Sequence, residues 1–300
     1  MKPAHLAFIL FIDLLWAMNV VAVKEIIDAL GPMTGVFLRY AIVLLVMLPW
    51  LRLVKGRMRD IVIAGVVSGA IFMGLGGLSF ALTENVAALS IAGQLGVPFS
   101  LILAVIFLGE TIRWIRIVGT AASFVGIVIM GFDPAIWDER LGVSLTILAS
   151  FMWAVGSMLF RRLQGVNPLT IHAWLAFVSV PLLLSAALWF EPGGIARAAD
   201  ADAHVWGWLI YAAVGSSIVG HAGMSWLLQR YPVTVMAPLT LPTPLIAVII
   251  AIMVYDTPIS FEFVVGALIT FVGVAVVTWR SATQKTDEGL VKEWAREVKR

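Results

Sequence analysis

Ten long apolar runs dominate this sequence, and they restrict it to a membrane fold. A helix rises by about 1.5 Å per residue, so each run is long enough to cross the hydrocarbon core of a bilayer. The 300-residue chain is 61% hydrophobic and 13% charged, too few charges to cover a soluble surface. Uniformly apolar runs favour helices over a barrel, whose strands alternate apolar and polar residues. We therefore predict an all-α membrane protein with ten transmembrane helices, near residues 4–23, 32–53, 61–82, 85–108, 113–132, 142–161, 168–190, 205–228, 233–254 and 260–279.

One segment of the chain occurs twice. A shift of about 146 positions places Gly69, Gly74, Gly77, Ser79, Leu82, Leu95 and Pro98 on Gly215, Gly220, Gly223, Ser225, Leu228, Leu241 and Pro244. With slightly different spacing, Gly119 and Gly126 fall on Gly266 and Gly273, and Trp16 falls on Trp153. Each copy holds five helices, an odd number, so the second copy enters the membrane inverted. Inverted repeats are typical of transporters, with the substrate site near the midplane between the halves. We expect one repeat at 1–132, the second at 142–280, and a charged tail at 281–300.

Basic residues predict the orientation. With the amino terminus inside, the inner segments carry sixteen Lys and Arg residues, whereas the outer loops carry only Lys24, Arg140 and Arg197. The positive-inside rule therefore places both termini in the cytoplasm. The first run is longer than a signal-peptide core and lacks a small-x-small cleavage site, so we interpret it as a retained helix.

Polar side chains inside apolar helices are costly and mark cavities or partners. Asn19 lies close enough to Trp16 on its helix to border the same cavity, or it bonds a neighbouring backbone. His221 stands between small residues, where it serves either as a hydrogen-bonding wall residue or as a proton relay. Trp153 occupies the place of Trp16 in the second half, and both rings suit bulky apolar groups. Asp13 and Arg39 are interpreted as structural charges, and the sequence leaves open whether they pair with each other; His172 is a weaker site candidate.

Prolines interrupt two equivalent helices. Gln94 precedes Pro98 by one turn, and the second copy contains Pro242 and Pro244. A proline frees a backbone carbonyl, which a membrane tolerates only where protein or water satisfies it. Paired interruptions of this kind indicate a transport site. Gln94 is therefore either a substrate ligand or a local partner of the kink.

Several classes of function are excluded by what the sequence lacks. It has no cysteine, and no metalloprotease, nucleophile-elbow, Walker A or dinucleotide motif, so we expect neither enzyme activity nor a metal or cofactor. The net charge of +2 does not suggest nucleic-acid binding. The glycines at 119, 126, 266 and 273 serve dimerisation or packing within the bundle, which leaves a monomer or a homodimer open.

Four segments resemble the drug/metabolite transporter superfamily, EamA type. They are Leu15–Lys24 (Leu-Trp-Ala-Met-Asn-Val-Val-Ala-Val-Lys), Phe107–Thr111 (Phe-Leu-Gly-Glu-Thr), Ser150–Ala154 and Gly266–Gly273. The resemblance covers residues 4–280 and implies ten helices in two inverted units, in a bacterial inner membrane. It also implies a cavity bordered by helices 1, 3, 4, 6, 8 and 9, with helices 5 and 10 peripheral. The residue equivalent to Asn19 in the second copy is Gly156, so we expect the first half to supply more of the polar groups of the site.

By this resemblance, the protein exports small amphipathic metabolites by alternating access, most readily amino acids with aromatic or other apolar side chains. Trp16, Asn19, Gln94, Trp153 and His221 would face the cavity. The alternatives are an antiporter of phosphorylated solutes, a broad-range drug exporter of the same superfamily, and an intramembrane enzyme or structural subunit. A phosphate site needs a cluster of cations, and Arg39 is the one basic residue expected within a helix.

Overall fold

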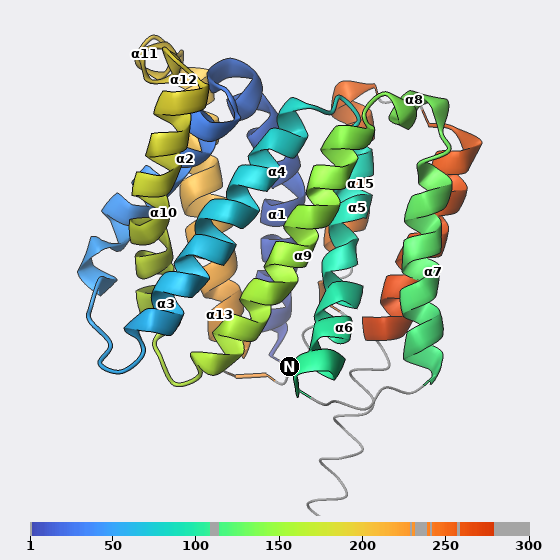
Figure 1. The fold of residues 1–300 in the computed structure, drawn as a ribbon, viewed down its shortest axis with the longest axis horizontal. Coiled ribbons are helices and arrows are strands. Elements are labelled where there is room, and N and C mark those ends of the chain that lie inside the picture. The colour runs from blue at the N-terminus through green and yellow to red at the C-terminus, as the bar shows by residue number, and fades with distance from the viewer. Residues whose placement is uncertain are drawn as a thin grey trace, which may run out of the picture.

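The computed structural model describes residues 2–108, 114–228, 230–231, 239–240, 242–256 and 259–278 (Figure 1). Within these residues, eight helices are long and apolar enough to cross a membrane, and two shorter apolar helices join them. The prediction of ten spanning helices is therefore confirmed. The ten segments are α1 (Pro3–Leu30), α2 (Pro32–Met47), α3–η2–α4 (Met58–Ala64, Gly65–Ile71, Phe72–Ala81), α5–η3–α6 (Val86–Ala92, Gly93–Leu95, Gly96–Leu108), α7 (Trp114–Met130), α9 (Arg140–Arg162), α10 (Pro168–Phe190), α12–η4–α13 (Ala203–Ile210, Tyr211–Ala222, Gly223–Leu228), α15 (Pro242–Tyr255) and the last helix, Phe261–Thr278.

Some boundaries differ from the sequence-based ones. The helix α1 continues past residue 23 to Leu30, because Lys24 is buried and paired with Asp28 and Glu84 at 3.0 and 3.5 Å. It ends at Gly31, whose φ of 94° favours glycine. The predicted ninth helix is described from Pro242 onward, and its first part lies outside the described residues. The tail at 281–300 and the Gly-Glu-Thr part of the Phe107–Thr111 segment also lie outside them.

The two repeats are inverted. We call the two ends of the bundle the Lys2 end and the Leu30 end, after the two ends of α1. Helix α9 is the copy of α1 and runs in the opposite direction, as Figure 1 shows. Its start lies at the Leu30 end, where Glu139 accepts hydrogen bonds from the backbone of Glu84 and Asn85 at 3.1 Å. Its other end lies at the Lys2 end, where Arg57 donates to the carbonyl of Arg162 at 2.9 Å.

The first helix of each repeat packs into the other repeat. Helix α1 contacts α15 and η4 of the second half, and its copy α9 contacts α6 and α4 of the first half. Helices α2 and α10, which are also equivalent, pack against each other. The two halves are therefore interleaved, and the space between them is walled by both.

Helix α7 and the last helix form a tight pair at one edge of the bundle (Figure 1). A Cβ added to Gly126 would lie 2.5 Å from the carbonyl oxygen of Gly266, and a Cβ on Gly266 would lie 2.5 Å from that of Gly126. Gly119 and Gly273 face each other in the same way. Only glycine allows this close approach of two backbones. These four glycines thus join the fifth spanning helix (α7) to the tenth (Phe261–Thr278) within one chain.

Two π-helical stretches occur at equivalent places. The stretch η2 begins at Gly65 and η4 begins at Tyr211, which matches the repeat shift of about 146 positions. π-helical turns are uncommon, widen the helix, and are frequent at functional sites. The sequence analysis did not predict them, because hydrophobic periodicity does not distinguish a π turn from an α turn.

Candidate transport site

The fourth spanning helix loses its α-helical geometry just before Pro98, which lies in the first turn of α6. A short 3-10 turn, η3, separates α5 from α6. Ser150 of α9 donates to the carbonyl of Gly93 at 3.2 Å and so satisfies a backbone group in this turn. Gln94 donates weakly to the carbonyl of Ser90 one turn earlier, at 3.5 Å. In the second half, Pro242 begins α15, and Pro244 is buried in its first turn.

The stretch η4 arranges the polar groups of the eighth spanning helix. The carbonyl of Ser216 bonds to two side chains, accepting from the indole nitrogen of Trp16 at 3.3 Å and contacting Nδ1 of His221 at 3.0 Å. The rings of Trp16 and His221 lie 5.3 Å apart. A Cβ on Gly220 would lie 2.5 Å from the indole nitrogen of Trp16, so this glycine allows the ring to sit against the helix.

Arg39 of α2 reaches the same stretch. Its Nε donates to Oγ of Ser217 at 3.0 Å, and its Nη2 donates to Oγ of Ser216 at 3.4 Å. The side chain is 6% exposed. Arg39 does not pair with Asp13: Asp13 accepts a 2.7 Å hydrogen bond from Thr243 of α15, and its other oxygen has no partner among the described residues. The two residues face different neighbours because α1 turns Asp13 towards α15 and not towards α2.

A cavity of about 430 Å³ lies between the two halves. It reaches from mid-depth towards the Leu30 end, since Val23, Phe80 and Thr146 stand near that end of their helices. Polar side chains from both halves line it: Asn19, Arg39 and Ser90 from the first, and Thr146, Ser150, Ser216 and His221 from the second. The two halves contribute almost equal numbers of polar side chains and the cation comes from the first half, so the expectation that the first half supplies more of the polarity stays a prediction.

Four of the five predicted site residues lie on the wall of this cavity: Trp16, Asn19, Trp153 and His221. Gln94 is absent from the lining and is bonded to its own helix, so its amide serves the kink. The first, third, fourth, sixth and eighth spanning helices line the cavity, as the resemblance implied. Among the described residues, the ninth spanning helix (α15) contributes none, and the second (α2) adds Val36 and Arg39. The start of α15 packs on α1 instead of reaching the cavity.

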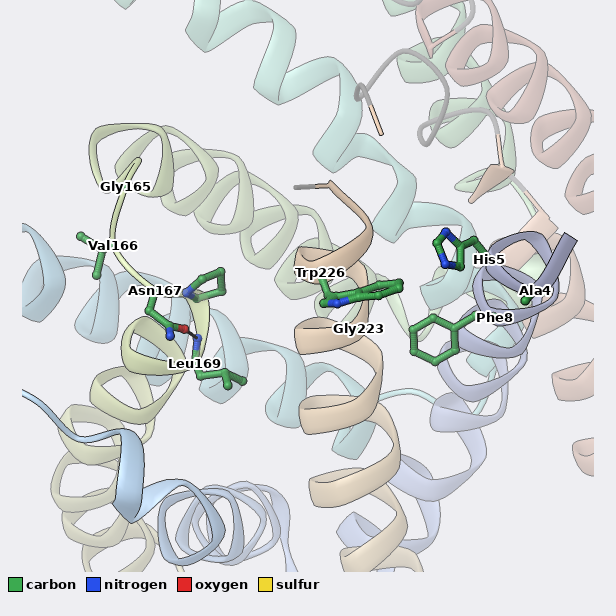
Figure 2. A pocket seen from close by; sticks show the side chains of 10 residues that line it. Ala4, His5, Phe8, Gly165, Val166, Asn167, Leu169, Gly223 and Trp226 are labelled. Carbon is green, nitrogen blue, oxygen red and sulfur yellow. Dashed lines mark hydrogen bonds between the residues drawn. The ribbon is translucent and has the colours of Figure 1, made fainter. Parts of the chain in front are cut away.

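A wide opening lies at the Lys2 end. Figure 2 shows its lining, with His5, Phe8 and Trp226 on one side and Val166, Asn167 and Leu169 on the other. Its volume is about 1050 Å³. Close packing of α1 against α13 separates this mouth from the central cavity. Ile9, Ile12 and Leu227 are fully buried there, and a Cβ on Gly223 would lie 2.8 Å from the ring of Phe8.

An interleaved pair of inverted five-helix units, with a partly polar central cavity closed on one side, defines a membrane transporter. The sequence matches the model of the EamA-like transporter family twice, at residues 4–132 and 140–279, and the chain belongs to that family.

Several curated proteins are similar to this chain in sequence at low identity. An uncharacterized transporter of Archaeoglobus fulgidus is 25% identical over 87% of this chain and 94% of its own length. A probable amino-acid metabolite efflux pump of Escherichia coli is 23% identical, over 69% of this chain and 73% of its own. The aromatic amino acid exporter YddG of Salmonella typhimurium is 24% identical, over 90% of this chain and 95% of its own length. One solved crystal structure superimposes with a TM-score of 0.62 at 16% identity, covering 93% of this chain and 97% of that one, which supports the fold alone.

Proposed function

We propose that this protein exports small amphipathic metabolites across the bacterial inner membrane, most readily amino acids with aromatic or other apolar side chains. The observation that carries the proposal is the central cavity. Its volume of about 430 Å³ lies in the range of roughly 300–1,000 Å³ found for small-molecule sites. Two tryptophan rings offer apolar surface, and Asn19 and His221 offer hydrogen bonds. The names of the Escherichia coli and Salmonella relatives support this substrate class.

Transport would proceed by alternating access. The described state is closed between α1 and α13, where Ile9, Ile12 and Leu227 are buried. Separation of these two helices would join the mouth at the Lys2 end to the cavity. Because α1 packs on the second half and α9 on the first, the inverted repeats can exchange conformations about the bound molecule.

The orientation that the basic residues predict makes the Lys2 end cytoplasmic, so the mouth would take up substrate from the cell. The chain has no cysteine, and single cysteines can therefore be labelled without background. Arg59→Cys at the Lys2 end should be shielded from a membrane-impermeant maleimide in intact cells, and Asp200→Cys should react. The reverse pattern would contradict the orientation.

Counterflow in proteoliposomes tests the function directly. Labelled tryptophan, threonine and a sugar phosphate should be taken up in that order of preference. Replacing Trp16, Asn19, Trp153 or His221 by alanine should lower tryptophan uptake by about tenfold or more, since each removes a contact to substrate. Gln94→Ala is the matched control, because Gln94 bonds only to its own helix in the described residues. Preference for the sugar phosphate would favour an antiporter of phosphorylated solutes. Equal uptake of all three compounds would favour a broad-range drug exporter.

A further inference from the structure

Arg39 is a buried cation without a carboxylate partner in the described part of the chain. Its two hydrogen bonds go to serine hydroxyls, which carry no charge. Asp13 of α1 accepts from Thr243, and Glu191, which follows α10, accepts from the backbone of Met33 and Thr34 at the start of α2. A charge held at this depth without a counterion is costly, and such residues are generally functional.

The serines orient the guanidinium and leave part of it free. The hydroxyl of Ser217 donates to the carbonyl of Ala212 at 3.0 Å, so its lone pairs face Nε of Arg39. A guanidinium has five N–H donors, and the two serines use two of them. The remaining three have no hydrogen-bond partner among the described residues. Because Arg39 lines the central cavity, an anionic group in that cavity is the available acceptor.

The rest of the wall indicates which anion. Arg39 is the one Lys or Arg among the described lining residues, and a single planar guanidinium matches a carboxylate bidentately, whereas phosphate sites use several cations. On the wall of the same cavity, Oδ1 of Asn19 has no hydrogen-bond partner among the described residues. Rotation of this amide about its last side-chain bond would present an acceptor to an ammonium group.

We propose that Arg39 binds the carboxylate of the transported molecule and thereby makes the cavity selective for carboxylates and zwitterions over analogues that lack the carboxylate. This inference rests on the transport function proposed above and assigns a residue to its selectivity. Ser216 and Ser217 are positioning residues, because they act through Arg39.

The test is inhibition of tryptophan counterflow by a matched series: unlabelled tryptophan, tryptophanamide, which lacks the carboxylate, and indole-3-propionate, which lacks the ammonium group. In the wild type, tryptophan should inhibit at about tenfold lower concentration than tryptophanamide, as expected for a hydrogen bond between charged groups. In Arg39→Gln this ratio should approach one, and in Arg39→Lys it should be intermediate. Arg59→Gln removes an exposed charge from the Lys2 end and should keep the wild-type ratio. The double variant Ser216→Ala, Ser217→Ala should raise the inhibitory concentration of tryptophan more than that of tryptophanamide, and so lower the ratio between them.

The outcomes separate the two proposals. Equal inhibition by tryptophan and tryptophanamide in the wild type would overturn the role of Arg39, even if Arg39→Gln did not fold. A wild-type ratio that persists in Arg39→Gln would also overturn it. Absence of amino-acid transport by the wild type would instead contradict the proposed function. In that case, thermal stabilisation of the wild type by indole-3-propionate but not by its amide, lost in Arg39→Gln, would still support a carboxylate site, and equal stabilisation would reject it.

Discussion

The two π-helical stretches occupy the same place in the two repeats and have different surroundings. In η2, the backbone of Gly69 packs on Ser179 and Leu175 of α10, and Ser68 contacts Gly156 of α9, so helices cover the stretch closely. In η4, Ser216 and Ser217 bond to Trp16 and Arg39 at the edge of the cavity. At the equivalent positions of η2 the chain has Ala70 and Ile71.

This difference shows how a duplicated unit acquires an asymmetric site. The repeat fixes the backbone, including the wide turn, at both places. Side chains then decide whether that turn packs against a neighbouring helix or holds polar groups towards a ligand. Substitutions at paired glycines can test this division of roles. The same change should impair the protein at one of the two equivalent positions and have little effect at the other.

The largest effect is expected at the first pair, Gly69 and Gly215. A Cβ on Gly69 would clash with Oγ of the buried Ser179 and lie 3.2 Å from the carbonyl of Leu175, so Gly69→Ala should destabilise the protein by about 2 kcal/mol. A Cβ on Gly215 would meet only ordinary contacts at 3.5–3.6 Å. Gly215→Ala should therefore be neutral or slightly stabilising, since alanine favours helix. Thermal unfolding in detergent measures both, and equal midpoints would contradict the close packing of η2.

The second pair, Gly220 and Gly74, should show the reverse. A Cβ on Gly220 would displace the ring of Trp16 and disturb its bond to Ser216, which should cost about 1–2 kcal/mol and reduce transport by roughly tenfold. The nearest atoms to a Cβ on Gly74 are 3.9 Å away. Gly74→Ala is thus the matched control and should transport normally. If both variants transport at the wild-type rate, Trp16 is not held against η4 for function.

The smallest effect is expected at the equivalent tryptophans. Trp16→Phe removes the donor to the carbonyl of Ser216, a bond worth about 1 kcal/mol, and should reduce transport by a few fold. The indole nitrogen of Trp153 makes no hydrogen bond in the described residues, and its ring packs on Phe72 at 5.3 Å. Trp153→Phe should therefore keep most of the activity. Counterflow at matched protein levels distinguishes them, and a larger loss in Trp153→Phe would show that ring size matters more than the hydrogen bond.

The sequence was sufficient to predict the ten helices and their inversion, because apolar runs and repeated glycines are local signals. It also identified Trp16, Asn19, Trp153 and His221, which the structure brings to one cavity. It did not place Arg39 at the cavity, since nothing local in the sequence shows whether Asp13 and Arg39 meet, and only tertiary packing sends them to different helices. Ser216 and Ser217 stand at positions that are Ala70 and Ile71 in the first repeat. This difference is a sequence signal that could have indicated a polar wall in the second half.

The interleaving of the repeats also has a consequence for biosynthesis. Helix α1 is synthesised well before α15, the ninth spanning helix, to which Thr243, the partner of its carboxylate, belongs. A carboxylate near the middle of a lone helix costs roughly 2.5–3.5 kcal/mol during insertion into the bilayer. The nascent chain must therefore carry Asp13 without its Thr243 partner until α15 has been synthesised, so the packing of α1 is completed by a segment made much later than α1 itself.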